Sequence, residues 1–406
     1  MNRALVTALV AAGLLMPGTG AQAATEGQDQ CSPDTPRSIA STPSALPRLA
    51  ADAAWQWATG AGVTVAVVDS GVNSANAHLT GAVVPGTDLV GQAGDPSGQT
   101  DVAGHGTAIA GQIAAREVSG SGVIGLAPEA TILPVRVYYA DDDQAKEAGT
   151  APDAGRIAQG IRYAAQSGAQ VINVSMSTPN DSPDLQAAVQ EARAAGSLVV
   201  ASAGNRGTST DTSDGPRYPA AYPEVLAVTA VDGTGAPTEA AIHGEHIDVA
   251  APGTEVLTAF HAAGDCVLAG SDASTSFATA YVSAAAALVA ERYPDETPAQ
   301  WAYRLEVTAL RAQPAQHDEL VGWGVIRPDL ALGFVDDGTA AGPTSPVHGE
   351  TLSTEVTARV VDSSPRVDPL TGARAAAVWW VLGGGTVVLL SVLASRFGRR
   401  RRGSAR

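Results

Sequence analysis

Residues 63–69 have the sequence VTVAVVD, a run of mostly β-branched residues that ends in an aspartate. Runs of this length and composition are typical of strands buried on both faces of a parallel sheet. Four similar runs follow: TILPVRV (131–137), VINVS (171–175), SLVVAS (197–202) and VLAVTAV (225–231). We therefore expect these five segments to be strands of one sheet.

Helical segments lie between these runs. Residues 154–167 repeat aliphatic residues at helical spacing, and residues 183–195 and 298–311 begin with Ser-Pro and Thr-Pro. A hydroxyl at the N-cap followed by proline at the first helical position is a helix-start signal. The alternation predicts an α/β domain with a mainly parallel sheet covered by helices on both faces.

The first 23 residues are typical of a secretory signal peptide. They contain an early arginine, a short apolar run and Ala21-Gln22-Ala23, which predicts cleavage after Ala23. The alternative is a retained membrane anchor. The apolar run is, however, shorter than the ~20 residues that a span needs.

The other end predicts a transmembrane helix over residues 374–396. Residues 375–395 contain no charge and include two tryptophans, and residues 399–402 are four consecutive arginines. A buried helix of a soluble domain would not end in such a cluster. The length of this uncharged run fits one membrane crossing. The arginines that follow it predict that the tail, residues 397–406, is cytoplasmic. The expected location is thus the cell membrane, single-pass, with residues 24–373 outside.

Between these ends we expect three parts. Residues 24–50 are rich in Ser, Pro, Thr and Gln and predict an extended N-terminal arm. Residues 51–333 form the α/β domain. Residues 334–373 are polar and contain Pro and Gly, which predicts a linker to the membrane helix.

Charge and cysteine content agree with export. Residues 24–373 contain 16 of the 24 basic residues and all 41 acidic ones, a net charge of about −25. Such a surface disfavours nucleic acid and anionic lipid as partners. The two cysteines, Cys31 and Cys266, are expected to form a disulfide outside the cell, with two free thiols as the alternative.

Three residues could carry chemistry, although each also has an ordinary structural explanation. Asp69 ends a predicted strand, where an aspartate is commonly a cap or turn residue. His105 lies between two glycines and could simply be a loop residue. Ser276 lies at a predicted helix start, where a hydroxyl commonly caps the helix. Their order along the chain, Asp…His…Ser, is that of one known type of serine-protease triad.

The motifs around these residues resemble the subtilase family over about residues 55–332. VAVVDSGV surrounds Asp69, GHGTAIAG surrounds His105, STSFATA surrounds Ser276, and LVVASAGN ends at Asn205. The resemblance implies a subtilisin-like domain in which Ser276 is the nucleophile, His105 the general base and Asp69 the residue that orients it. It also implies that Asn205 contributes to the oxyanion hole. The same resemblance implies that the substrate-binding residues are Asn173, Val174, Ser175, Met176, Ser202, Ala203 and Gly204.

Two positions depart from the family pattern. Ser274 replaces the usual glycine before the nucleophile motif, and Ala280 replaces the usual proline four residues after the nucleophile. A serine would be strained at position 274 if that backbone needs positive φ. The lost proline would reduce rigidity near the helix start. We expect an intact triad with modest activity.

The whole arrangement resembles the mycosins, membrane-anchored subtilases of actinobacterial type VII secretion. The shared features are the N-terminal extension, a cysteine ahead of the serine motif, the linker and the C-terminal span. The resemblance implies an arm that stays attached, a protein or peptide substrate, and type VII secretion membrane components as partners. A scaffold role in the secretion complex is the alternative, and a nutritional exoprotease is a weaker one because of the membrane tether.

No cofactor or metal site is expected. The remaining histidines show no zinc-like spacing. The acidic segment 141–153 could bind calcium, but it lacks the spacing of an EF-hand, and a solvated loop is the simpler interpretation.

Overall fold

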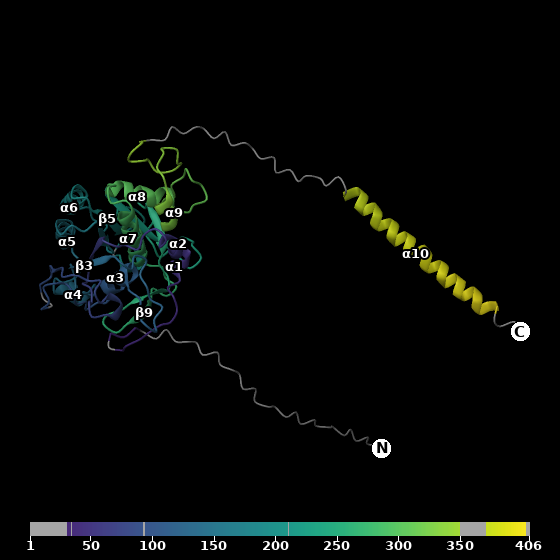
Figure 1. Ribbon diagram of the computed structural model, residues 1–406, viewed down its shortest axis with the longest axis horizontal. Helices are drawn as coiled ribbons and strands as arrows, with labels where there is room; N and C mark the ends of the chain where they lie inside the picture. The colour runs from purple at the N-terminus through teal and green to yellow at the C-terminus, as the bar shows by residue number, and fades with distance from the viewer. Residues whose placement is uncertain (1–30, 34, 92–93, 210, 350–370, 403–406) are drawn as a thin grey trace, which may run out of the picture. The chain divides into compact units, whose positions relative to one another are not determined.

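The computed structural model describes residues 31–349, apart from 34, 92–93 and 210, and residues 371–402 (Figure 1). The chain divides into two units between residues 352 and 353. The predicted signal peptide, residues 24–30 of the arm, residues 350–370 of the predicted linker and the last four residues lie outside the described part.

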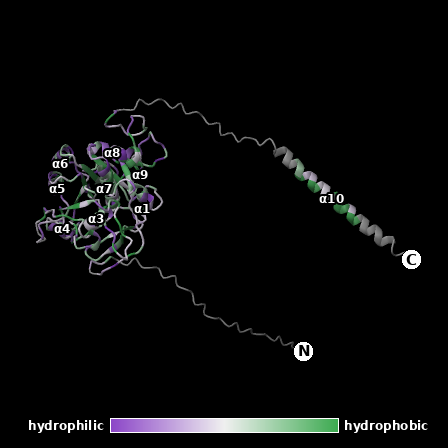
Figure 2. Cartoon of the chain, viewed as in Figure 1, coloured by the Kyte–Doolittle hydropathy of each residue, from purple (hydrophilic) through white to green (hydrophobic). Residues whose placement is uncertain are grey.

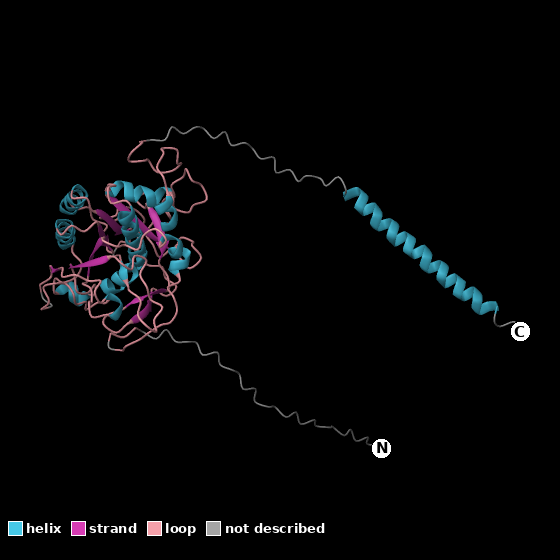
Figure 3. Cartoon of the chain, in the orientation of Figure 1, coloured by secondary structure: helices cyan, strands magenta, loops and turns pink. Residues whose placement is uncertain are grey.

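The first unit is built on a seven-stranded parallel sheet with the order β2-β3-β1-β4-β5-β6-β7. Figure 3 shows the strands in magenta with helices around them. The strands of the sheet are β1 Thr64–Asp69, β2 Thr87–Asp88, β3 Thr131–Arg136, β4 Val171–Val174, β5 Leu198–Ser202, β6 Val225–Val231 and β7 Val249–Pro252. All five strands expected from the sequence are present. The two that were not expected, β2 and β7, are short edge strands. The predicted fold class is confirmed.

Alternate residues of the strands enter two separate cores. In β1, Val65 and Val67 belong to one buried cluster, and Ala66 and Val68 belong to the other. This alternation follows from the two-residue period of a strand. Both faces are apolar because helices cover both, which explains the continuous hydrophobic runs in the sequence.

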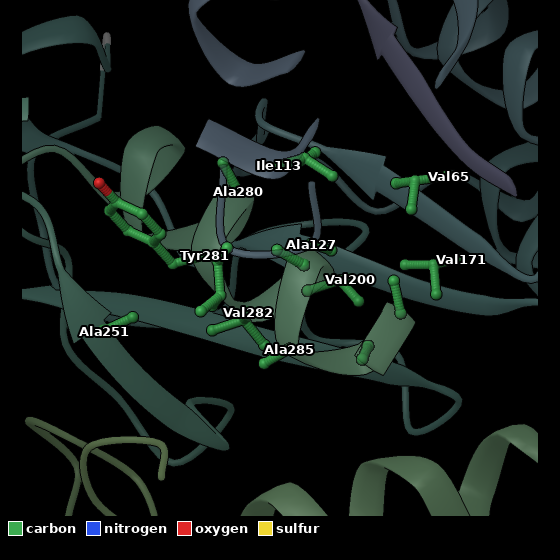
Figure 4. Close-up of a cluster of buried hydrophobic side chains, with 14 of the residues drawn as sticks. Val65, Ile113, Ala127, Val171, Val200, Ala251, Ala280, Tyr281, Val282 and Ala285 are labelled. Carbon is green, nitrogen blue, oxygen red and sulfur yellow. The ribbon is translucent and has the colours of Figure 1, made fainter. Parts of the chain in front are cut away.

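Helices α3 (His105–Ala114) and α7 (Thr275–Arg292) cover the face that holds Val65. Figure 4 shows side chains of α7, among them Ala280, Tyr281 and Val282, in one cluster with strand residues Val65 and Val171. Sixteen consecutive residues of α7, 275–290, are buried, and most are small. Small side chains let this helix lie close to the sheet.

Helices α5 (Ala154–Gln166) and α6 (Pro183–Ala194) cover the opposite face. Their starts follow the sequence signals, because Asp153 and Ser182 each accept a hydrogen bond from a backbone N–H of the first turn. Helix α8 (Pro298–Val307) begins with a capping box between Thr297 and Gln300. It ends four residues earlier than expected.

The remaining elements are short and were not expected from the sequence. They are α1 Ala45–Arg48, α2 Ala51–Ala54, η1 Ala77–Leu79, α4 Asp143–Glu147, η2 Arg206–Thr208, α9 Pro328–Gly333 and the antiparallel hairpin of β8 Val256–Ala259 and β9 Asp265–Leu268.

The N-terminal segment is bound to this hairpin. The predicted disulfide between Cys31 and Cys266 is present. Arg37 exchanges two backbone hydrogen bonds with the hairpin, and the Ile39 N–H donates to the Asp265 carboxylate at 2.6 Å. Closer to the domain the segment is not simply extended, because residues 45–48 form α1 and bury Leu46 in the core.

Residues 334–349, which begin the predicted linker, belong to the first unit and contact α8 and the loop that follows it. The Arg304 guanidinium donates to the Phe334 carbonyl at 2.7 Å, and Arg311 donates to the Ala341 carbonyl. The predicted boundaries of the linker stay predictions.

The second unit contains helix α10, Thr371–Arg402. Its segment Ala376–Leu393 is long and apolar enough to cross a membrane, judged by length and composition (Figure 2). The hydroxyls of Thr386 and Ser391 donate to backbone carbonyls one turn earlier in the same helix. These bonds satisfy the two hydroxyl donors within the helix itself.

A pair of carboxyl groups makes the stability of the first unit depend on pH. Burial raises the pKa of Asp248 to about 7. Burial and the neighbouring Asp248 carboxylate raise the pKa of Glu306 to about 8. The folded state therefore keeps protons that the unfolded chain releases above pH ~4, so stability falls as pH rises from about 4 to 8.

We expect Asp248→Asn to stabilise the protein at pH 8 by about 1–3 kcal/mol and by clearly less at pH 5, where only part of the penalty has developed. Asparagine keeps the oxygen that accepts from the Ala227 N–H but cannot ionise. Urea unfolding at the two pH values measures the effect, with the exposed Asp295→Asn as the control. Equal effects of Asp248→Asn at both pH values would contradict the assignment.

Candidate active site

Asp69 and His105 are brought together by the ends of β1 and α3. Asp69 is the last residue of β1 and is fully buried. His105 is the first residue of α3, and its Nδ1 lies 2.8 Å from Oδ1 and 3.0 Å from Oδ2 of Asp69. The two residues are 36 positions apart in sequence.

The glycines on either side of His105 are required by this approach. Gly104 has φ +79°, a left-handed conformation that favours glycine. A Cβ on Gly106 would overlap the Gly71 carbonyl oxygen. The Gly-His-Gly motif therefore places the start of α3 directly against the end of β1.

Several donors surround the Asp69 carboxylate. Oδ1 accepts from the Ser70 N–H at 2.8 Å and from the Tyr138 hydroxyl at 3.0 Å, and the Ser70 hydroxyl lies 3.2 Å from it. Sequence reasoning did not identify Tyr138. The available signal was its position just after β3, at the same edge of the sheet as Asp69.

The charges near His105 favour its protonated form. Burial opposes the imidazolium, but the Asp69 carboxylate, with smaller contributions from Asp101 and Asp141, raises the pKa of His105 above its usual 6.5. The ring remains partly accessible, with 27% of the side chain exposed. It can therefore exchange a proton with a bound molecule.

Ser276 is the second residue of α7 and lies beside Ser175, the residue that follows the end of β4. Its hydroxyl donates to the Ser175 carbonyl at 2.9 Å, and the Ser175 hydroxyl donates to the Ser276 carbonyl at 3.0 Å. The ring of the next residue, Phe277, lies 5.7 Å from the His105 ring, measured between centroids. Among the described contacts, the Ser276 hydroxyl bonds to Ser175 and not to His105.

Asn205 lies beside the start of the same helix. Its Oδ1 accepts from the Thr275 N–H at 2.9 Å and from the Thr275 hydroxyl at 3.0 Å. These bonds orient the amide and leave its nitrogen as the donor. Gly204, with φ +101°, allows the chain to turn here after β5.

The residues expected to bind substrate lie in or just after strands β4 and β5 and differ in how deeply they are buried. Asn173 and Val174 are fully buried in β4, where Asn173 bonds to Ser175 and Ser283. Ser175 and Met176 follow the end of β4 beside Ser276. Ser202, Ala203 and Gly204 lie at the end of β5 and are buried.

The backbone strain considered for Ser274 does not arise. Ser274 has φ −111° and ψ 124°, an extended conformation that any residue adopts. Helix α7 continues without a break through Ala280, which is fully buried. Alanine therefore supplies the backbone N–H that proline would lack.

No cluster of three or more metal-ligating side chains occurs among the described residues. In the acidic segment, Asp142 caps α4 and Asp143 pairs with Lys146 at 3.1 Å. Both carboxylates thus have structural partners.

Comparison with known proteins identifies the family. Residues 60–324 match the model of the subtilase family. Mycosin-1 of Mycobacterium tuberculosis is 38% identical over 332 residues, which cover 71% of this chain and 73% of the relative. Thermitase of Thermoactinomyces vulgaris is 37% identical over 245 residues, 60% of this chain and 81% of the relative.

Solved structures agree with these matches. The crystal structure of MycP1 from the ESX-1 type VII secretion system superimposes with a TM-score of 0.65 at 31% identity, covering 76% of this chain and 91% of that chain. The structure of MycP3 from the type VII (ESX-3) secretion system superimposes with a TM-score of 0.64 at 31% identity, covering 76% of this chain and 90% of that chain. The resemblance inferred from the motifs is confirmed: this chain belongs to the subtilase family of serine endopeptidases and is similar to the mycosins within it.

Proposed function

We propose that this chain is a membrane-anchored serine endopeptidase whose triad is Asp69, His105 and Ser276. The observation that carries the proposal is the contact of 2.8 Å between His105 Nδ1 and the buried Asp69 carboxylate, next to the start of the helix that contains Ser276.

In the proposed mechanism, the Ser276 hydroxyl turns from the Ser175 carbonyl towards His105 when substrate binds. His105 takes its proton as Oγ attacks the peptide carbonyl, and later gives that proton to the leaving amine. Asp69 keeps the imidazole in the tautomer with hydrogen on Nδ1 and stabilises the cation that forms. The Asn205 amide and the Ser276 N–H are the proposed oxyanion donors. The helix dipole of α7 favours the same negative charge.

We further propose that the catalytic unit acts outside the cell membrane, with the C-terminal tail in the cytoplasm and type VII secretion components as partners. The apolar segment of α10 and the arginines that follow it support this orientation. The similarity to MycP1 and MycP3, two proteins described as parts of type VII secretion systems, supports the association.

The N-terminal arm is proposed to stay attached in the mature enzyme. The Cys31–Cys266 disulfide and the hydrogen bonds of Arg37 and Ile39 to the hairpin support this. A removable inhibitor would not need a covalent bond to the domain.

One observation keeps a scaffold role as the second candidate. The Ser276 hydroxyl bonds to a backbone carbonyl and not to His105. In unliganded enzymes, catalytic hydrogen bonds commonly form only with substrate, so this geometry is compatible with conditional activity in an assembly.

The deciding experiment is labelling of the full-length protein with a fluorophosphonate probe. We expect the wild type to be labelled and both Ser276→Ala and His105→Ala to be unlabelled, because the probe reacts only with an activated serine. Ser274→Ala is the matched control, since it removes a neighbouring hydroxyl that makes no helix-capping bond. A folded wild type that is not labelled would contradict the protease proposal and favour the scaffold.

A further inference from the structure

Tyr138 is held beside Asp69 by the pairing of two strands. Arg136, the last residue of β3, pairs with Asp69, the last residue of β1, and the Val137 N–H donates to the Asp69 carbonyl at 2.8 Å. Tyr138 follows directly. Its ring belongs to the same buried cluster as Val68, and the residue is 6% exposed.

The Tyr138 hydroxyl meets both partners of the Asp69–His105 contact. It lies 3.0 Å from Asp69 Oδ1 and 3.3 Å from His105 Nδ1. Because Nδ1–H is directed at the carboxylate, the phenol hydrogen must go to Asp69. Burial and the carboxylates of Asp69 and Asp101 raise the pKa of Tyr138 well above 10, so the phenol keeps this hydrogen at neutral pH.

The other hydroxyl at this carboxylate cannot replace it. Ser70 has one hydroxyl hydrogen, which lies between Asp101 at 2.9 Å and Asp69 at 3.2 Å. The shorter distance favours Asp101. Tyr138 has one carboxylate partner among the described hydrogen bonds, and that partner is Asp69.

We propose that Tyr138 is a positioning residue of the catalytic centre, whose hydroxyl holds Oδ1 of Asp69 and thereby sets the orientation of His105. This inference rests on the proposed function, because it assigns Tyr138 to the same triad.

Two consequences follow from the geometry. Without the hydroxyl, Asp69 loses a fixed donor, so the carboxylate and the imidazole are less well oriented for proton transfer. The carboxylate also becomes more basic, so it holds the imidazolium more strongly. The other charged groups that act on His105, Asp101 and Asp141, are unchanged.

The test compares Tyr138→Phe with Tyr139→Phe in the full-length protein, with a peptide substrate. Tyr139 is the matched control because its hydroxyl also donates to a carboxylate, Asp88 at 3.0 Å, but not to the triad. We expect Tyr138→Phe to lower kcat about tenfold with KM within about twofold. We also expect the acid limb of kcat/KM to move up by about half a pH unit. Tyr139→Phe should leave kcat, KM and the acid limb of kcat/KM unchanged.

Two further comparisons separate positioning from a structural effect. In an Asp69→Asn background, Tyr138→Phe should cause no further loss, because its partner is already changed. Equal losses from Tyr138→Phe and Tyr139→Phe, or an unmoved acid limb, would overturn the proposal.

Two measurements keep the test independent of folding and of hydrolysis. If Tyr138→Phe does not fold, 3-fluorotyrosine at position 138 keeps the shape but donates more strongly. It should move the His105 titration to lower pH, and no movement would overturn the proposal. If the wild type hydrolyses nothing, the protease proposal fails. The titration of His105 followed by ¹⁵N NMR in wild type and variant still decides the role of Tyr138.

Discussion

Ser276→Ala is expected to lower kcat for peptide hydrolysis by about 10⁶-fold. The change removes the oxygen that would form the acyl-enzyme and leaves only the oxyanion donors and substrate binding to act. Because the nucleophile and its base act as one unit, the double variant Ser276→Ala/His105→Ala should be only slightly slower than Ser276→Ala alone. Steady-state hydrolysis of a fluorogenic peptide measures both.

The control for this prediction is Ser274→Ala, two residues earlier, which should retain activity close to that of the wild type. Thermal unfolding of each variant checks that the fold is intact. A Ser276→Ala protein that keeps more than about one hundredth of the wild-type rate would exclude Ser276 as the nucleophile.

Asp69→Asn is expected to lower kcat by about 10⁴-fold while the protein stays folded. The amide keeps the shape of the carboxylate. Its NH₂ group can face His105 Nδ1 only when that nitrogen has no hydrogen, so the imidazole takes the wrong tautomer. The rate constant of fluorophosphonate labelling should fall as well. The final extent of labelling should still approach that of the wild type after long incubation.

For Asp69→Asn the informative comparison is Asp88→Asn. Asp88 is also a carboxylate beside β3, but it pairs with Arg136 at 3.0 Å and with Tyr139, and not with His105. If Asp88→Asn loses as much activity as Asp69→Asn, the loss reflects general damage near β3. A loss confined to Asp69→Asn supports its role in orienting His105.

The two departures from the family pattern have little structural consequence. Ser274 is extended, and α7 passes through Ala280 without a break. They therefore give little support to the scaffold alternative. The observation that now keeps this alternative is the bond from the Ser276 hydroxyl to the Ser175 carbonyl.

The amino-acid sequence by itself determined the central sheet and the main helices. Runs such as VLAVTAV at 225–231 are strands because β-branched, apolar residues favour a buried strand wherever they occur, and this segment became β6 with the same bounds. The starts of α6 and α8 were likewise encoded by a hydroxyl and a proline that act within one turn. The ordered motifs around Asp69, His105 and Ser276 were sufficient to identify the family, which the comparisons confirmed.

Tertiary structure alone decided the short strands β2 and β7 and the hairpin of β8 and β9, whose stability depends on their neighbours and not on their own residues. It also decided the surroundings of the triad. The Tyr138 hydroxyl reaches Asp69 across 69 positions, and the Ser276 hydroxyl reaches Ser175 across 101. The first contact forms because β1 and β3 end at a common edge of the sheet, and the second because α7 begins beside the end of β4. The physical reason is that hydrogen bonds depend on distances between atoms, and a linear sequence does not contain these distances.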